Sequence, residues 1–334
     1  MTADPLLRVD GLTVEFPVRG GSRIRAVDDV SFEVRSGEII GLVGESASGK
    51  STLGLSIMRM VPRPGEVTAS AIEFDGRNLL DLSEGHMRQV RGSDISLIVQ
   101  DALATMNPVT TVEEQIEQVV RDHEGVRSRR TLRERAIAAL RSVQLPNAEA
   151  NLRRYPHELS GGMQQRVAIA QGLILGPKLI IADEPTTALD VTVQAQILAL
   201  LKTIADAGTS ILFVTHDLAT VAEICDRVLV MYAGRLVEQG TTAEVFANPQ
   251  HPYTRALLES LLPLGGEPPE TLSAIPGQPP TPEAWPTGCR FHPRCPLWRA
   301  KGEPEICRED DPAPVLVNGT HHAACHFAER LARA

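Results

Sequence analysis

The strongest constraint in this sequence is a glycine-rich segment that directly follows a short apolar run. Residues 39–43, Ile-Ile-Gly-Leu-Val, predict a strand that is buried on both faces. The next eight residues, 44–51, fit the pattern G-x-x-x-x-G-K-S/T, and a helical pattern follows them. A strand, a phosphate-binding loop and a helix in this order open a parallel α/β unit. We therefore expect a nucleoside triphosphate at the start of that helix.

The residues of this loop have distinct expected roles. Its backbone N–H groups point inward and surround the β-phosphate at the positive end of the helix. Lys50 is expected to reach the β- and γ-phosphates, and Ser51 is expected to place its hydroxyl on Mg²⁺. The predicted nucleotide-binding residues of this segment are Gly44, Glu45, Ser46, Ala47, Ser48, Gly49, Lys50, Ser51 and Thr52.

A second apolar run ends in two adjacent carboxylates. Residues 179–182, Leu-Ile-Ile-Ala, predict another buried strand, and Asp183 and Glu184 follow it directly. The carboxyl ends of such strands are where α/β sheets bind ligands. Asp183 is expected to hold Mg²⁺, directly or through water, and Glu184 is expected to act as the general base for the attacking water.

The remaining sequence patterns also predict an α/β fold. Residues 6–35 alternate apolar and polar positions, which predicts two or three strands with a glycine-rich turn at residues 20–21. Residues 110–155 lack strand-like runs and are typical of helices. Two further apolar runs, 211–214 and 228–231, predict buried strands. Strands alternating with helices indicate a mostly parallel sheet that helices cover on both faces.

Charge and hydropathy exclude some classes of protein. The formal net charge is -9, which argues against a general nucleic-acid-binding protein, so we expect no nucleic-acid partner. No run of about 18 uncharged apolar residues is present, and residues 1–10 do not have the pattern of a secretory signal. We therefore expect a chain that stays in the cytoplasm and meets a membrane only through other subunits.

Residues 159–166, Leu-Ser-Gly-Gly-Met-Gln-Gln-Arg, resemble the signature motif of ABC ATPases. Physically, this segment is a second helix N-terminus, with Ser160 as its cap and with Gly161 and Gly162 allowing an anion to approach closely. In ABC proteins the signature contacts the γ-phosphate that is bound by the opposite subunit. The resemblance implies an ABC-type P-loop ATPase core with an N-terminal antiparallel β subdomain and a helical subdomain, and it implies ATP as the nucleotide.

The resemblance also implies roles for four further residues. Gln100 matches the Q-loop glutamine, which senses Mg²⁺ and the attacking water. Asp190, in the segment Thr-Ala-Leu-Asp, matches the D-loop at the dimer interface. His216 matches the switch histidine that contacts the γ-phosphate, and Phe16 lies where the family places an aromatic residue that stacks on adenine.

Narrower features are similar to the ABC importers of dipeptides and oligopeptides. These features are Met163 inside the signature, the long run from Asp183 to Gln196, and the segment His-Pro-Tyr-Thr-Arg-Ala-Leu-Leu at 251–258. The chain departs from the ABC pattern at Ala47, where the family usually has glycine. It also lacks the common phenylalanine before Gln100 and the proline two residues after it.

The subfamily resemblance implies a larger assembly. Because the chain has one copy of each motif, it needs a second ABC ATPase subunit, which in this subfamily is usually a different chain. The expected further partners are two transmembrane permease subunits and an extracytoplasmic peptide-binding protein. The helical subdomain, at about 101–160, is expected to receive the cytoplasmic coupling helices of the permeases. The chain would thus lie peripherally at the cytoplasmic face of the cell membrane.

Two competing functions remain at this stage. A non-transport ABC ATPase with a metal-binding module would usually have two ATPase domains in one chain, coiled-coil insertions or basic surfaces, and none is evident here. A regulatory subunit without turnover is disfavoured because Lys50, Asp183, Glu184 and His216 are all present.

The C-terminal part differs in composition from the rest. We predict a nucleotide-binding domain over 1–262 and, over 263–334, a proline-rich strap with a small cysteine-rich extension. Four thiols in a reducing compartment suggest a metal, either a [4Fe–4S] cluster or Zn²⁺, and relatives in the subfamily have been associated with an iron–sulfur cluster. Unligated thiols are the remaining alternative. The expected ligands are Cys289, Cys295, Cys307 and Cys325.

Overall fold

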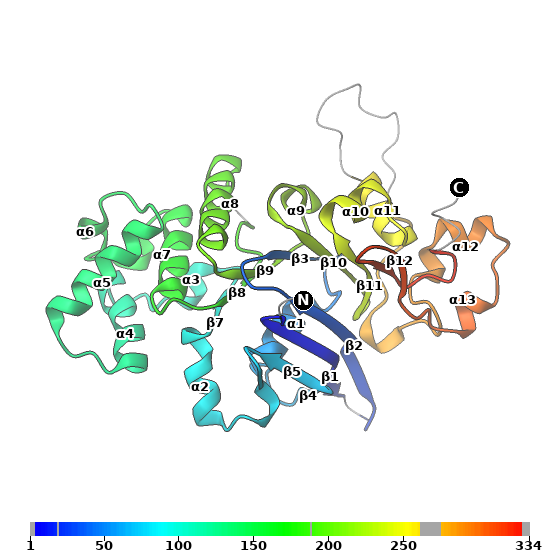
Figure 1. Ribbon diagram of the computed structural model, residues 1–334, viewed down its shortest axis with the longest axis horizontal. Coiled ribbons are helices and arrows are strands. Elements are labelled where there is room, and N and C mark those ends of the chain that lie inside the picture. The colour runs from blue at the N-terminus through cyan, green and yellow to red at the C-terminus, as the bar shows by residue number, and fades with distance from the viewer. Residues whose placement is uncertain (1–3, 19, 188, 261–274, 329–334) are drawn as a thin grey trace. The chain divides into compact units, whose positions relative to one another are not determined.

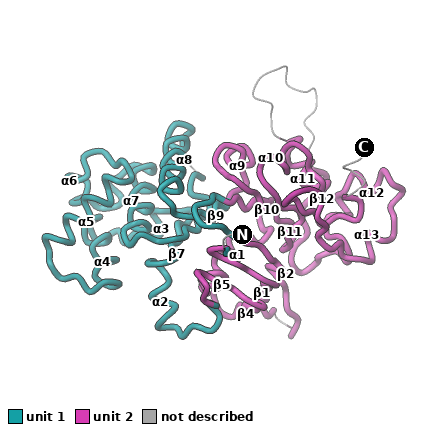
Figure 2. The backbone as a smooth tube through the Cα atoms, in the orientation of Figure 1, with its two compact units in different colours: residues 1–4, 34–39, 78–214 teal, residues 5–33, 40–77, 215–334 magenta. Residues whose placement is uncertain are grey.

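The computed structural model describes residues 4–18, 20–187, 189–260 and 275–328. The chain divides into two compact units, which interleave along the sequence (Figure 1, Figure 2). The predicted domain boundary between 262 and 263 lies outside the described residues, as do the first residues of the predicted strap. Among the described residues, the structure has no helix with the length and apolar character that crossing a membrane requires.

Unit 1 comprises residues 1–4, 34–39 and 78–214. Its three strands pair in parallel in the order β9–β8–β7, as expected for buried apolar runs. The strands are β7 (Ile95–Ile98), β8 (Leu179–Asp183) and β9 (Ser210–Thr215). The helices are α2 (Glu84–Ser93), α3 (Ala102–Thr105), α4 (Val112–Glu124), α5 (Arg129–Ser142), α6 (Ala148–Asn151), α7 (Gly161–Leu173) and α8 (Val191–Asp206).

Helix α4 illustrates why this region folds as helices. Val112, Ile116 and Val120 recur at every fourth position and are fully buried, so they form one apolar stripe. The helix begins at a capping box, in which the Thr111 hydroxyl accepts from the Glu114 N–H while the Glu114 carboxylate accepts from the Thr111 N–H. Helices α4 and α5 pack against α7, and α7 packs against β7. The predicted helical region between residues 110 and 155 therefore forms a helical layer in unit 1.

Unit 2 comprises residues 5–33, 40–77 and 215–334. It contains the expected N-terminal antiparallel sheet and a second sheet in which β10 and β3 pair in parallel. The strands are β1 (Leu7–Pro17), β2 (Arg23–Val34), β3 (Ile39–Val43), β4 (Glu66–Thr68), β5 (Ala71–Phe74), β6 (Arg77–Asn78), β10 (Arg227–Tyr232), β11 (Arg235–Thr241), β12 (Val315–Asn318) and β13 (His321–Ala323). The helices are α1 (Lys50–Ile57), α9 (Leu218–Ile224), α10 (Thr242–Ala247), α11 (Pro252–Glu259), α12 (Pro296–Ala300) and α13 (Ile306–Glu309).

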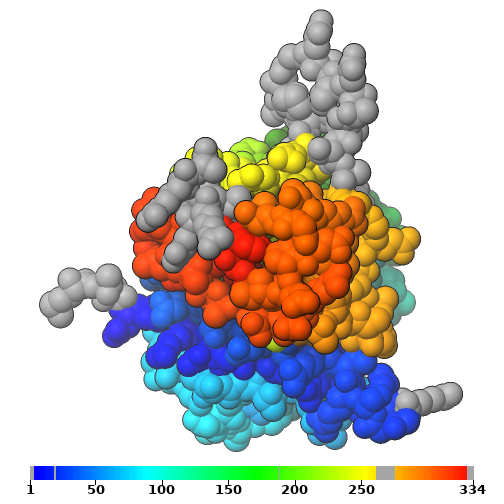
Figure 3. Space-filling model, turned by 90° about the vertical axis from the view of Figure 1, so that its right-hand side faces the viewer, coloured from blue at the N-terminus to red at the C-terminus, as the bar shows by residue number. Residues whose placement is uncertain are grey.

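The C-terminal residues are built into unit 2 instead of forming a separate body. Strand β13 pairs antiparallel with β11, and β12 pairs with β13, so the two strands extend the sheet of β10 and β3. The Glu238 carboxylate accepts a hydrogen bond of 2.6 Å from His321 Nε2, and both side chains are buried. In Figure 3 the orange and red C-terminal residues cover a face next to the blue N-terminal strands.

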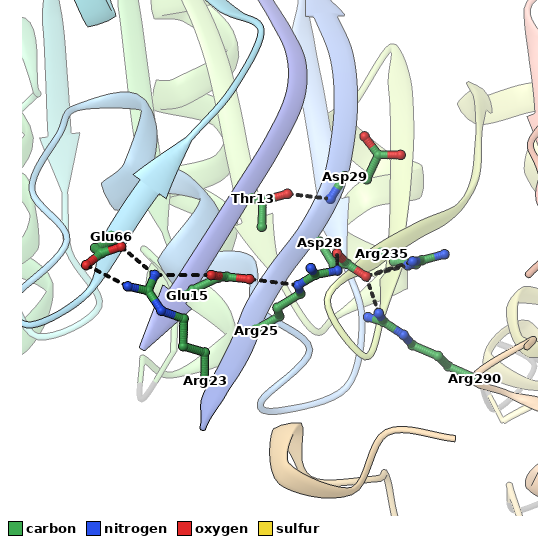
Figure 4. Close-up of polar contacts among 9 residues, drawn as sticks. All are labelled: Thr13, Glu15, Arg23, Arg25, Asp28, Asp29, Glu66, Arg235 and Arg290. Atoms are coloured by element: carbon green, nitrogen blue, oxygen red, sulfur yellow. Dashed lines mark hydrogen bonds and ion pairs between the residues drawn. The ribbon is translucent and has the colours of Figure 1, made fainter. Parts of the chain in front are cut away.

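A buried carboxylate also ties the extension to the N-terminal sheet. Asp28, on β2, accepts hydrogen bonds from Arg25, Arg235 and Arg290 (Figure 4). The Arg290 guanidinium also lies 3.7 Å from the centre of the Trp285 ring, which is a cation–π contact. Side chains from β2, from β11 and from the C-terminal extension therefore meet at the Asp28 carboxylate.

Candidate functional site

The glycine-rich loop connects β3 to α1 and has two positions that only glycine can occupy. Gly44 has φ 159°, and a Cβ atom there would lie 2.1 Å from the Met231 carbonyl oxygen. Gly49 has φ 104°, and a Cβ atom there would lie 2.5 Å from the Ala26 carbonyl oxygen. No side chain caps the N-terminus of α1, and the positive end of a helix favours an anion there.

The polar groups of the loop suit a phosphate ligand. The Lys50 side chain is buried, and its ammonium donates to the carbonyl oxygens of Gly44 at 2.8 Å and Glu45 at 3.0 Å. The buried Ser48 hydroxyl has no hydrogen-bond partner among the described residues. A buried hydroxyl without a partner costs free energy, and a bound phosphate oxygen would satisfy it. The loop therefore fits a nucleoside triphosphate.

The remaining predicted residues of unit 2 near the loop are Ala47, Ser51, Thr52 and Phe16. Ala47 has φ 62°, in the left-handed region that glycine favours, which explains why the family pattern has glycine there. Ser51 and Thr52 lie in the first turn of α1. The half-buried Phe16 ring lies on β1 against Gly65, where an added Cβ atom would be 2.6 Å from Phe16 Cε1.

In unit 1 the structure brings Gln100 and Glu184 together. Glu184 follows β8 with φ 47°, and its N–H donates to the Val214 carbonyl oxygen at 2.8 Å. Its carboxylate Oε2 accepts hydrogen bonds from Gln100 Nε2 at 3.1 Å and from the Thr187 hydroxyl at 3.0 Å. These two donors orient the carboxylate, which is what a general base requires. Asp183 ends β8 directly before it and is half-buried.

The signature segment and the D-loop are neighbours in unit 1. A Cβ atom on Gly162 would lie 2.5 Å from Val193 Cγ1, so the start of α7 approaches α8 closely only because this residue is glycine. A Cβ atom on Gly161 would meet only Leu189 Cδ2 within 4 Å, at 3.9 Å. The Asp190 carboxylate accepts from the Val193 N–H at 2.9 Å and caps α8.

The predicted capping role of the Ser160 side chain is wrong. Ser160 occupies the cap position of α7, but its hydroxyl makes no capping hydrogen bond, and its carbonyl oxygen accepts from the Gln164 N–H at 2.9 Å. The first N–H groups of α7 are therefore not covered by the serine, which favours an external anion over a local cap.

The predicted residues fall into two sets. Gln100, the Ser160–Gly162 segment, Asp183, Glu184 and Asp190 belong to unit 1, whereas Phe16, the phosphate loop and His216 belong to unit 2. His216 is exposed and follows β9, directly before the Asp217 cap of α9.

Sequence reasoning missed two supporting residues. Thr187 holds the Glu184 carboxylate, and the Tyr253 hydroxyl accepts a hydrogen bond of 2.8 Å from the Glu45 N–H in the phosphate loop. Burial raises the pKa of Tyr253, so its hydroxyl stays protonated. Tyr253 lies in the segment 251–258, which resembles the peptide importers. Nothing in the sequence, however, indicates that Tyr253 contacts the phosphate loop.

The predicted metal site is not supported by the described residues, in which no group of three or more His, Cys, Asp or Glu side chains is placed to hold a metal ion. The Cys295 sulfur instead caps α12 by accepting from the Trp298 N–H at 3.4 Å. Burial raises the pKa of Cys289 to about 12 and that of Cys325 to about 11. The four tail cysteines nevertheless line one cavity of about 20 Å³.

Two family descriptions match the chain, "ABC transporter" over residues 27–187 and "Oligopeptide/dipeptide transporter, C-terminal region" over residues 237–301. Protein y4tR of Sinorhizobium fredii, whose name describes a peptide ABC transporter ATP-binding protein, is 47% identical and covers 97% of this chain and 95% of its own. The dipeptide transport ATP-binding protein DppD of Escherichia coli is 43% identical and covers 96% of both chains.

A solved structure, the dimeric ABC transporter cassette MJ0796, has a TM-score of 0.62 at 29% identity and covers 71% of this chain and 98% of its own. The matches extend over nearly the whole chain in sequence and over the cassette in structure. The chain therefore belongs to the ATP-binding subunits of ABC transporters, in the branch that carries the oligopeptide/dipeptide transporter C-terminal region.

Proposed function

We propose that this chain hydrolyses ATP to energise the import of dipeptides or oligopeptides. The observation that carries the proposal is the joint presence of the nucleotide-site motifs and the oligopeptide/dipeptide transporter C-terminal region at 237–301. Relatives that match over 96% of the chain or more are named for peptide or dipeptide transport. The relatives reported above are transport proteins by name, which favours transport over a non-transport ATPase.

In the proposed mechanism, the phosphate loop binds the nucleotide and the acidic strand end acts on Mg²⁺ and the attacking water. Lys50 and the N–H groups of the loop bind the phosphates. Ser51, Asp183 and Gln100 are the residues that would hold Mg²⁺, which would neutralise charge on the β- and γ-phosphates. Glu184 accepts a proton from the attacking water while Gln100 and Thr187 hold its carboxylate in place. His216 would contact the γ-phosphate.

The remaining motifs belong to a partner's site. Ser160, Gly161 and Gly162 present a helix N-terminus that would bind the γ-phosphate held by a second ATPase subunit, and Asp190 would lie at the dimer interface. The similar solved cassette is dimeric, which supports this arrangement. Each complete site would thus need two chains, so we expect turnover only in the assembled dimer.

The expected permease contact has a matching surface in unit 1. A groove of about 630 Å³ lies on the helical layer and is lined by residues of α3 and α4, such as Thr105 and Gln118. Val109, beside it in the sequence, is 78% exposed. We propose that this groove receives a cytoplasmic helix of each permease subunit, which would place the chain peripherally at the cytoplasmic face of the membrane. An external binding protein would supply the peptide.

Purification of the tagged chain from gently solubilised membranes of its own cell tests this proposal. We expect two permease chains and a second ATPase to co-purify, and we expect ATP turnover by the reconstituted assembly to rise with peptide and binding protein. An assembly carrying Glu184→Gln is the matched control for peptide uptake. Co-purification of nucleic acid without permeases would contradict the proposal and favour a non-transport ATPase.

A second proposal concerns the four tail cysteines, which we propose bind a metal centre that holds the extension together. The four cysteines line one cavity of about 20 Å³, which supports the proposal. Four cysteines can hold either a single Zn²⁺ ion or a [4Fe–4S] cluster. Anaerobic purification with iron and zinc analysis decides between them. Protein with neither metal, and equal to a Cys307→Ser variant in stability, would contradict the proposal.

A further inference from the structure

The phosphate loop is held from outside by a residue of the C-terminal extension. Glu45 is the second residue of the loop, and its carboxylate accepts two hydrogen bonds from Arg294, at 2.6 Å from Nη1 and 3.0 Å from Nη2. This is a bidentate arginine–carboxylate pair, a geometry that orients both groups. The two residues are 249 positions apart in the sequence. Both lie in unit 2.

Arg294 is anchored independently of Glu45. Its side chain is 7% exposed, Nε donates to the Pro276 carbonyl oxygen at 2.9 Å, and Nη2 donates to the Gly277 carbonyl oxygen at 3.3 Å. Nη1 also donates to the Tyr232 hydroxyl at 3.3 Å. An arginine guanidinium stays protonated in proteins. These three contacts therefore hold a charged group in place before any nucleotide arrives.

The contact between Arg294 and Glu45 affects nucleotide binding because it neutralises a carboxylate in the phosphate loop. A carboxylate within a loop that receives a triphosphate repels it, and like charges in a partly buried site repel one another more strongly than in water. Arg294 neutralises this carboxylate. Tyr253 holds the main-chain N–H of the same residue at 2.8 Å. Residue 45 is thus fixed through its backbone and its side chain by groups that lie outside the loop.

We propose that Arg294 is a positioning residue for ATP binding, by which the C-terminal extension neutralises and orients Glu45 in the phosphate loop. The inference concerns only nucleotide affinity, so it stands whatever the transported substrate is. It assigns the extension a direct role at the nucleotide site. Substitution of Arg294 should weaken ATP binding through a charge that no longer has a partner, and removing that charge should restore part of the affinity.

The test measures the Kd for Mg-ATP of the full-length chain by titration calorimetry, beside the thermal midpoint without nucleotide. We expect Arg294→Gln to weaken binding about tenfold and Arg294→Lys about threefold, because lysine keeps the charge but not the paired geometry. The double variant Glu45→Gln/Arg294→Gln should bind at least threefold more tightly than Arg294→Gln alone. The control is Arg308→Gln, which breaks an exposed pair with Glu303 in the same extension and should change neither quantity.

Two results would overturn the inference. One is an Arg294→Gln variant that binds Mg-ATP as the wild type does. The other is a double variant with no recovery, which would show that Arg294 acts only through the fold of the extension. If Arg294→Gln does not fold, the Arg294→Lys variant decides, and an unchanged Kd at an unchanged thermal midpoint would overturn the inference.

Discussion

The Gln100 side-chain amide donates a hydrogen bond of 3.1 Å to the Glu184 carboxylate, across 84 positions of the sequence. This contact joins the residue expected to sense the attacking water to the residue expected to deprotonate it. Thr187 donates to the same carboxylate oxygen at 3.0 Å. Two neutral donors therefore orient the base. Two predictions concern this carboxylate, and a third concerns the phosphate loop.

Glu184→Gln should lower the rate of ATP hydrolysis by the assembled transporter at least about 100-fold, because general-base catalysis contributes roughly that much or more. Glutamine is close in size to glutamate, so binding of Mg-ATP should persist and the closed assembly should accumulate. Steady-state phosphate release and nucleotide binding measure the two effects. Glu149→Gln, which removes an exposed glutamate of the same unit, is the control. Turnover near the wild-type rate would show that Glu184 is not the base.

Gln100→Ala should slow hydrolysis roughly 10- to 150-fold, since it removes one hydrogen bond to a carboxylate, worth roughly 1.5–3 kcal/mol. Gln100→Glu should slow hydrolysis more than Gln100→Ala does, because a second carboxylate would face Glu184 and repel it. Single-turnover rates of the assembly distinguish these effects from altered nucleotide binding. Gln89→Glu, on the exposed side of α2, adds the same charge away from the site and serves as the control. Equal rates for the two Gln100 variants would contradict the electrostatic reason.

Ala47→Gly should be tolerated, whereas Ala47→Val should weaken ATP binding more than about tenfold. Ala47 has φ 62°, where an L-residue is strained by roughly 1–2 kcal/mol and a β-branched residue by more. Glycine relieves this strain but gains entropy in the unfolded chain, so stability should change by less than about 1 kcal/mol. Nucleotide titrations and thermal unfolding measure both quantities. The same pair of changes at exposed Ala150 in α6 should not alter nucleotide affinity.

Asp28→Asn should destabilise the fold at pH 7 by about 2–3 kcal/mol, because it leaves three arginines without their shared carboxylate. Burial raises the pKa of Asp28, but Arg235, Arg290 and Arg25 outweigh it and lower the pKa below its usual value. The carboxylate therefore stabilises the fold above the unfolded-state pKa of about 3.9, and this contribution is lost as the pH falls through the lower folded-state pKa.

Urea unfolding of wild type and Asp28→Asn at pH 7, 5 and 3.5 measures this dependence. The difference in unfolding free energy should be full at pH 7 and 5 and smaller at pH 3.5. Asp10→Asn removes an exposed aspartate whose nearest ion-pair distance is 3.7 Å, so it should change stability by less than about 0.5 kcal/mol. A difference that does not vary with pH would mean that packing, not charge, explains the effect of Asp28→Asn.

Much of the fold and part of the site could be predicted from local patterns. The runs at 39–43, 179–182 and 228–231 lie in β3, β8 and β10, because continuous apolar stretches fit only strands that are buried on both faces. The predicted capping by Ser160 was wrong, because a serine in the cap position does not determine where its hydroxyl points. The predicted cysteine ligand set is not supported, because spacing along an irregular tail does not determine how its thiols are oriented.

The sequence by itself determined the phosphate loop, the acidic strand end and the signature segment, since each is a contiguous run whose function follows from strand, turn and helix N-terminus. Only the tertiary structure decided which distant groups support them. Arg294 meets Glu45 across 249 positions, and Gln100 meets Glu184 across 84. Neither contact produces a pattern in the sequence, because the pairing of two distant side chains depends on how the segments between them fold.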